Sequence, residues 1–176
     1  LAYETVHITS DRQRTPVEVT ARIVDIGGRR LCLTVSHSIA AHKELARHGY
    51  GLLIHDGYRP WAITKLFWDM TSGSQREFVA DPRTGSKHNR GCAVDLTMYD
   101  LATGMVVEMP GGYDEMTRRS YPDYQGGPPE ARGKRDLLRQ AMERHGFTVE
   151  PNEWWHFNYQ DWQQYPILDV PFSAIR

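Results

Sequence analysis

Residues 86–95 read Ser-Lys-His-Asn-Arg-Gly-Cys-Ala-Val-Asp, a polar turn that leads into a strand-like apolar run ending near Tyr99. Asp95 interrupts this run. A carboxylate inside an apolar strand is costly unless a cation or hydrogen bonds stabilise its charge. The stretch therefore predicts a strand over 92–99 that carries a buried ionised group, and a metal ion would supply the cation.

Periodicity on both sides of this stretch predicts the remaining elements. Helices are expected over 38–48, 60–70 and 132–145, strands over 50–55 and 154–159, a β-hairpin over 17–35 that turns at Gly27-Gly28, and a long loop over 110–130. Helices and strands do not alternate regularly, as they do in parallel α/β proteins. We therefore predict an α+β fold with a mainly antiparallel sheet and about three helices, in one domain over residues 1–176.

Composition restricts the classes of function. The 176 residues are 40% hydrophobic and 24% charged, which is the balance of a globular protein. Lys and Arg number 21 against 22 Asp and Glu, so the net charge is -1 and no basic excess favours a nucleic-acid partner. The longest aliphatic run, Leu52 to Ile54, is far shorter than the roughly 20 residues of a membrane span. We predict neither nucleic-acid binding nor a transmembrane helix.

Two segments carry a candidate metal site. His88, Asp95 and His156 form a candidate three-ligand zinc set, because catalytic zinc takes three nitrogen or oxygen ligands and leaves one position to water. Glu153 is then the candidate general base, which takes a proton from the zinc-bound water while hydroxide attacks a carbonyl. Arg59 could stabilise the oxyanion that results from this attack. Two alternatives are open: Glu153 as a helix-cap or surface acid, and Arg59 as the partner of Asp56.

Two features of these segments test this hypothesis. Glu153 and His156 are three apart and would face opposite ways in an ideal strand, so a bulge or bend must realign them. Cys92 lies within the metal motif, but we expect its side chain to pack rather than bind metal. Cys32 and Cys92 are too few for a disulfide scaffold, and we predict two separate thiols.

Three motifs resemble one known family. They are Ser86-x-His88-x-x-Gly91-x-Ala93-x-Asp95, Glu153-x-Trp155-His156 and Asp56-Gly57-Tyr58-Arg59-Pro60. Together they are similar to the D-alanyl-D-alanine dipeptidases of the vancomycin-resistance type, zinc metallopeptidases that share a fold with D-Ala-D-Ala carboxypeptidases and the hedgehog domain. The resemblance implies that His88, Asp95 and His156 bind one zinc ion, that Glu153 is the base, and that Arg59 steadies the transition state.

The resemblance also covers a loop. Met109-x-x-x-Tyr113-Asp114-x-Met116-x-x-x-Ser120 looks like the substrate-covering loop of the dipeptidase branch, which implies that Asp114 meets the ammonium group of a small dipeptide. Ser86 is the candidate donor to the substrate carboxylate. The family-like core runs over 36–176, whereas 1–35 departs from the family pattern and lacks its aromatic-rich opening, with Tyr3 as a distant counterpart of a pocket tyrosine.

Three functions are carried forward. The first is zinc-dependent hydrolysis of D-Ala-D-Ala, which would deplete a peptidoglycan precursor or recycle cell-wall fragments. The second is a D,D-carboxypeptidase or a wall-lytic peptidase of the same fold, and the third is an inactive zinc-binding interaction domain. A free base and an oxyanion partner, Glu153 and Arg59, argue against the third. The sequence assigns neither the oligomeric state nor the compartment, bacterial cytoplasm or periplasm.

Overall fold

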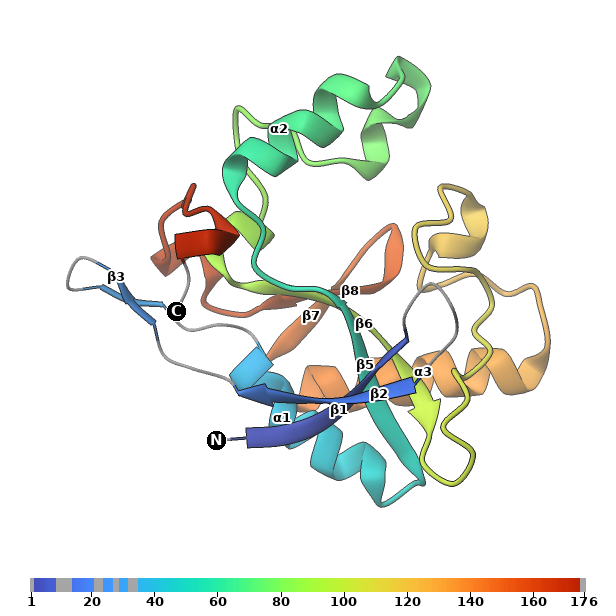
Figure 1. Cartoon of the computed structure of the whole chain (residues 1–176). Helices are drawn as coiled ribbons and strands as arrows, with labels where there is room; N and C mark the ends of the chain where they lie inside the picture. The colour runs from blue at the N-terminus through green and yellow to red at the C-terminus, as the bar shows by residue number, and fades with distance from the viewer. Residues whose placement is uncertain (1, 9–13, 21–23, 27–28, 32–34, 175–176) are drawn as a thin grey trace.

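The computed structural model describes residues 2–8, 14–20, 24–26, 29–31 and 35–174, and side chains from Ser38 onward (Figure 1). Its strands are β1 Ala2–Ile8, β2 Arg14–Thr20, β3 Val24–Ile26, β4 Arg29–Leu31, β5 Tyr50–Asp56, β6 Ala93–Asp100, β7 Phe147–Glu150 and β8 Glu153–Tyr159. Its α-helices are α1 Val35–Ala46, α2 Trp61–Met70 and α3 Pro129–Arg144. Short 3-10 helices are η1 Gly73–Phe78, η2 His88–Arg90, η3 Arg118–Ser120, η4 Trp162–Gln164 and η5 Phe172–Ala174.

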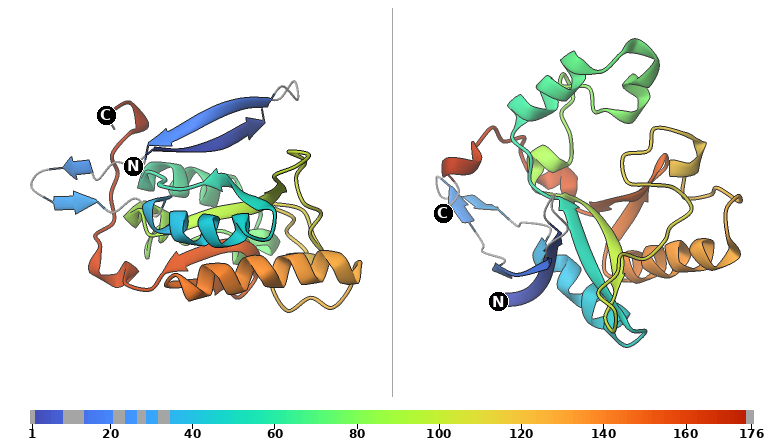
Figure 2. Two further views of the ribbon diagram at one scale, coloured as in Figure 1. Left: turned by 90° about the horizontal axis from the view of Figure 1, so that it is seen from below. Right: turned by 45° about the vertical axis from the view of Figure 1, so that its right-hand side comes forward.

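The central sheet has four antiparallel strands in the order β5-β6-β8-β7. Helices α1 and α3 lie side by side against one face of this sheet (Figure 2). The core between these layers is apolar and contains Leu45 of α1, Leu138 of α3 and Phe157 of β8, all fully buried. The predicted α+β class with a mainly antiparallel sheet is confirmed.

Strand β6 separates the core from the site. Val94, Leu96 and Met98 belong to the core, and all three are fully buried. Because successive side chains of a strand point to opposite faces, Asp95 lies on the face away from the helices. Asp95 is paired in register with His156 of β8, so the two side chains are cross-strand neighbours. The alternation that builds the core therefore also brings two candidate ligands together.

A β-bulge shapes the segment that follows β5. The register with β6 shifts between Ile54 and Asp56, so His55 is the extra residue. Asp56 Oδ1 accepts a hydrogen bond from the backbone N–H of Gly57 at 2.8 Å, which tightens the turn after the strand. The chain then runs into α2, with Pro60 as the residue before its first turn. The bulge and the turn direct residues 57–59 toward η2.

Asn89 ties η2 to the start of α2. It is fully buried, and its Nδ2 donates to the Arg59 carbonyl and to Thr64 Oγ1, each at 2.8 Å. Its Oδ1 accepts a hydrogen bond from the backbone N–H of Ser86 at 2.7 Å. Since each partner lies on a different segment, one side chain holds the η2 turn against the strand-to-helix connection.

Two local predictions need correction, and one strand was not predicted. The N-terminal alternation predicts one hairpin over 17–35, but β2 pairs with β1, and within 17–35 the described pairing is that of β3 with β4. Residues 21–23, 27–28 and 32–34 lie outside the described residues. Helix α3 begins at Pro129 rather than 132, because proline suits the first turn of a helix. Strand β7 was not predicted, since four residues are too few to show a period.

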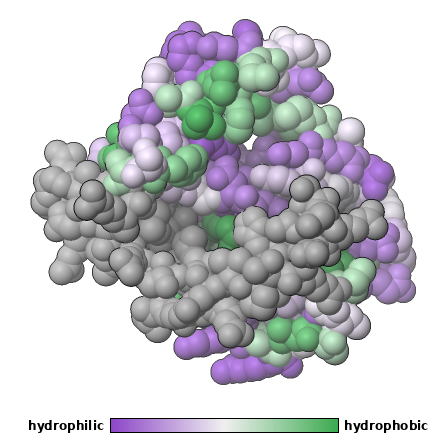
Figure 3. Space-filling model, viewed as in Figure 1, coloured by the Kyte–Doolittle hydropathy of each residue, from purple (hydrophilic) through white to green (hydrophobic). Residues whose placement is uncertain are grey.

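Helix α2 carries exposed apolar side chains. Leu66, Phe67 and Met70 are 48%, 43% and 75% exposed. Figure 3 shows apolar side chains gathered over this helix at the top of the view. The helices of residues 35–174 are all too short or too polar to cross a bilayer.

Replacing Asn89 with alanine should lower the free energy of unfolding by about 2–4 kcal/mol, because it leaves several buried backbone and hydroxyl groups without partners. Urea unfolding of the metal-free protein measures this change. Asn152→Ala is the matched control, since Asn152 makes an exposed hydrogen bond to the Glu77 carbonyl. Equal effects of the two substitutions would contradict the role given to Asn89.

Candidate metal centre

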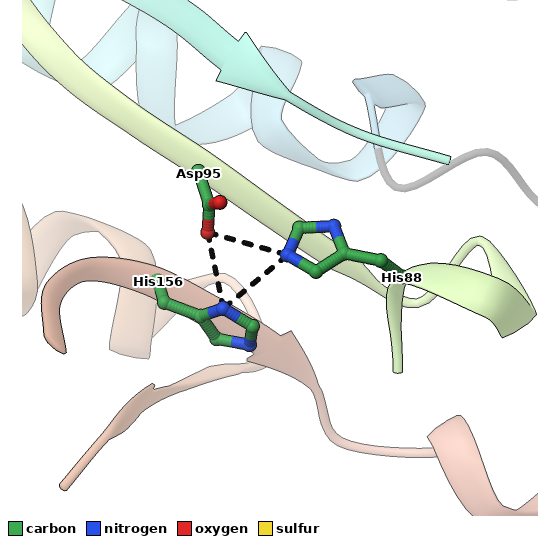
Figure 4. A group of neighbouring side chains, drawn as sticks. All are labelled: His88, Asp95 and His156. Atoms are coloured by element: carbon green, nitrogen blue, oxygen red, sulfur yellow. Dashed lines mark hydrogen bonds and ion pairs between the residues drawn. The ribbon is translucent and has the colours of Figure 1, made fainter. Parts of the chain in front are cut away.

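Three candidate ligands meet on the open face of the sheet. His88 comes from η2, Asp95 from β6 and His156 from β8, and all three are buried. Asp95 Oδ1 lies 3.0 Å from His156 Nδ1 and 3.3 Å from His88 Nε2, and the two ring nitrogens are 3.3 Å apart (Figure 4). One ligand atom from each residue lies within 4.8 Å of the others. The structure therefore assembles the predicted ligand set.

Each histidine has an oxygen acceptor behind its ring. His88 Nδ1 lies 2.6 Å from the Gly57 carbonyl oxygen, and a carbonyl can only accept. His156 Nε2 lies 2.8 Å from Asn158 Oδ1. If both outer nitrogens donate, the lone pairs of His88 Nε2 and His156 Nδ1 face Asp95. Histidines that bind metals are held in this way, with the other ring nitrogen hydrogen-bonded to an oxygen.

The Asp95 carboxylate fits a cation. The residue is 4% exposed, and among the described side chains its Oδ1 is a buried atom without a hydrogen-bond partner. Burial alone would raise the pKa of Asp95, but the two neighbouring imidazoles outweigh burial and hold the pKa well below its ordinary value. A buried carboxylate oxygen without a hydrogen bond, facing two imidazole nitrogens, provides the donor set of a catalytic zinc site.

A register shift aligns Glu153 with this ligand set. The pairing of β7 with β8 changes from Val149↔Phe157 to Glu150↔Glu153, so β8 is irregular at its start. Glu153 Oε2 consequently lies 3.4 Å from His156 Nδ1, although the two residues are three apart. The pKa of Glu153 is raised to about 7: burial raises it most, His156 opposes burial, and the carboxylates of Asp95, Glu150 and Asp114 add to the rise. The realignment that the sequence requires is present.

Arg59 lies in the wall of the same cavity and forms an ion pair. Its Nε and Nη2 lie 2.9 Å and 2.8 Å from Asp56 Oδ2. Its guanidinium also lies over the Phe67 ring of α2, 5.0 Å from the ring centroid. The pairing with Asp56, one of the alternatives that the sequence left open, is thus present, and it holds the guanidinium at the cavity wall.

The ligands open into a cavity of about 860 Å³. Asp114 and Ser86 also line it, as do Glu153 and Arg59. Partial burial and the Asp95 carboxylate raise the pKa of Asp114, whose backbone has a positive φ of 55°. Ser86 is buried, and its hydroxyl oxygen accepts a hydrogen bond from the backbone N–H of His88 at 3.2 Å. All seven predicted site residues therefore border one cavity.

Cys92 does not join the ligand set. It is 1% exposed, and its Sγ donates to the Arg90 carbonyl at 3.3 Å. The prediction that its side chain packs is confirmed. Cys32 lies outside the described residues.

Sequence reasoning gave no individual role to Tyr113, Asn158 or Glu150. Tyr113 stacks on the His55 ring with centroids 4.2 Å apart, and its hydroxyl donates to Asp95 Oδ2 at 3.5 Å. The long loop is thereby joined to a candidate ligand. Asn158 is two residues beyond His156, a spacing that places both on one face of a strand and was available in the sequence. Glu150 lies on β7, which the sequence did not predict.

The metal-free protein should become less stable between about pH 7 and pH 9. The Asp95 carboxylate outweighs burial and raises the pKa of His156 to about 9, so its imidazolium stabilises the fold below the unfolded pKa of 6.5 and this contribution is lost as pH rises through 9. The expected loss is on the order of 2–4 kcal/mol in urea unfolding of chelator-treated protein. His156→Gln should flatten the dependence. A wild-type unfolding free energy that is constant or rises over this range would contradict the assignment.

Comparisons with known proteins identify the family of this chain. The Peptidase M15 family model, described as D-ala-D-ala dipeptidase, matches residues 12–174. D-alanyl-D-alanine dipeptidases of Escherichia coli K12, Enterococcus faecium and Enterococcus faecalis V583 are 38%, 37% and 34% identical to this chain. The alignments cover 72%, 78% and 76% of this chain, and 64%, 77% and 74% of those proteins. The chain thus spans just under two thirds of the E. coli relative.

One solved structure is also similar, a zinc complex of the vancomycin-resistance D,D-pentapeptidase VanY from a VanB-type cassette. It has a TM-score of 0.45 and 17% identity, and the match covers 82% of this chain and 81% of that one. This similarity is too low to inform the site. The family match confirms the predicted enzyme class, and the donor set fits the predicted zinc cofactor. The chain belongs to the D-Ala-D-Ala dipeptidase family of M15 zinc metallopeptidases.

Proposed function

We propose that this chain hydrolyses D-Ala-D-Ala with a zinc ion held by His88, Asp95 and His156. The observation that carries the proposal is the position of Glu153. Its Oε2 lies 3.4 Å from a nitrogen of the ligand set and borders the cavity. A structural metal site has no use for such a carboxylate, whereas metal-assisted hydrolysis needs a base beside the ligands.

The proposed chemistry is divided between the metal and the protein. When bound, zinc polarises a substrate carbonyl and lowers the pKa of a water molecule toward neutrality. Glu153 takes a proton from the attacking water and returns it to the leaving amine. Burial beside the ligands raises the pKa of Glu153 in the metal-free protein, and a carboxyl whose pKa is raised toward neutrality can both take and return a proton.

The ends of a dipeptide match the charges of the cavity. Asp114 offers a carboxylate to the substrate ammonium group. The hydroxyl of Ser86 accepts from His88 and keeps its own proton available for the substrate carboxylate. Arg59, held by Asp56, is proposed to stabilise the negative charge that develops on the scissile carbonyl oxygen. A site with a partner for each charged end selects short, free substrates.

Purified, zinc-loaded protein should release free alanine from D-Ala-D-Ala, and chelator-treated protein should not. Glu153→Gln should lose about 10²–10⁴-fold in kcat and still bind zinc stoichiometrically, because glutamine removes only the proton acceptor. L-Ala-L-Ala is the stereochemical control. A Glu153→Gln variant that keeps full turnover would exclude Glu153 as the base, and a zinc-loaded wild type without turnover would favour a zinc-binding interaction domain.

Acetylating the amino group of D-Ala-D-Ala should lower kcat/KM by about 10–100-fold, because the substrate loses the charge that Asp114 would pair with. The same substrate pair should differ far less with Asp114→Asn. Equal rates of wild type on free and acetylated dipeptide would favour a D,D-carboxypeptidase, which acts on a D-Ala-D-Ala end without a free amino group.

A further inference from the structure

A chain of hydrogen bonds runs from the cavity wall to the back of the His156 ring. Lys87 Nζ lies 2.9 Å from Glu150 Oε2, and Asn158 Nδ2 lies 2.7 Å from the same oxygen. Asn158 Oδ1 then lies 2.8 Å from His156 Nε2. Lys87 and Glu150 line the cavity, while Asn158 and His156 are buried. We call the side chains of Lys87, Glu150 and Asn158, without His156, the Lys87–Glu150–Asn158 relay.

The chemistry of its first two members fixes the direction of the relay. An ammonium group only donates hydrogen bonds, and an ionised carboxylate only accepts them. Glu150 Oε2 forms an ion pair with Lys87 Nζ at 2.9 Å and accepts a hydrogen bond from Asn158 Nδ2. Asn158 must therefore turn its NH₂ group toward Glu150. Its carbonyl oxygen is then left facing His156, and this oxygen can only accept.

The last step selects one tautomer of His156. An acceptor at Nε2 requires that the ring proton be on Nε2, so the lone pair of a neutral ring is on Nδ1. Nδ1 is the nitrogen that lies 3.0 Å from Asp95 Oδ1. His88 reaches the equivalent state through the Gly57 backbone carbonyl, whose direction is fixed by the chain. The amide of Asn158 can be turned around. A further group must therefore fix the orientation of Asn158 before Asn158 can select the tautomer of His156.

We propose that Lys87, Glu150 and Asn158 are positioning residues that hold His156 in the tautomer whose Nδ1 binds the metal. The inference rests on the proposed role of His156 as a zinc ligand. The β7–β8 ladder supports it, because Thr148 of β7 pairs with Asn158 of β8 and Glu150 lies two residues beyond Thr148.

Asn158→Leu tests the acceptor. Leucine has a similar volume and no acceptor, so the zinc dissociation constant should rise about 10–100-fold, the usual cost of losing a group behind a ligand. Competition with a chromophoric chelator measures this constant. Thr148→Val is the matched control, because Thr148 is exposed and pairs with Asn158 in the β7–β8 ladder. If the Asn158→Leu variant binds zinc as tightly as the Thr148→Val variant does, the proposal is overturned.

Glu150→Gln tests the direction of the relay without changing its size. A glutamine amide can donate as well as accept, so it no longer fixes the orientation of Asn158, and zinc binding should weaken by about 3–10-fold. Nitrogen-15 spectra of the zinc-loaded protein should show a slowly exchanging His156 Nε2–H in the wild type. That signal should be lost or exchange rapidly in Glu150→Gln and Asn158→Leu.

The two proposals fail in different ways. If the Glu150→Gln variant has a lower unfolding midpoint but keeps the wild-type zinc affinity and the ring N–H signal, then Glu150 has only a structural role. That result would overturn the relay. Wild-type protein that binds no zinc would instead refute the metal site, and with it the proposed function. Weakened zinc binding in both variants, with the ring signal lost and Thr148→Val unaffected, supports the relay.

Discussion

The buried carboxylate of Asp95 is the group on which the arrangement of the site depends. It lies in the middle of an apolar strand, and its Oδ1 has no hydrogen bond among the described residues. A charge in that position must be balanced by positive or polarisable groups close by. The fold meets this requirement from two directions, with His156 as a cross-strand partner and His88 on a turn that precedes the same strand. Ser86 and Glu153 lie on the segments that carry these histidines, whereas Arg59 and Asp114 reach the same cavity from other parts of the chain.

The two histidines are oriented by different parts of the chain. His88 is fixed by a backbone carbonyl that belongs to the turn after β5, and Asn89 holds that connection against η2. His156 is backed by a side chain, which other side chains orient in turn. Backbone acceptors survive most substitutions at their own position, whereas a side-chain acceptor depends on residue identity. The His156 side of the site is therefore the more sensitive to sequence changes outside the ligand set.

Local sequence patterns predicted much of this site, and distant pairings account for what they missed. Asp95 inside an apolar run indicated the ligand set, and the three-residue spacing of Glu153 and His156 indicated a bulge. Alternation around Val17 predicted a strand but could not identify its partner, which is β1. Strand β7 is too short to show a period. Glu150 and Lys87 are 63 residues apart in sequence, and nothing local links them.

The register between β6 and β8 couples metal binding to folding. Asp95 faces His156 only when these strands pair as observed, because a slip of one residue would turn one of the two side chains into the helix-covered layer. A mispaired sheet would therefore lack the ligand set. A metal ion that binds the native pairing and not the slipped one stabilises the native pairing by mass action. Zinc availability during synthesis would then influence the yield of correctly folded chains as well as their activity.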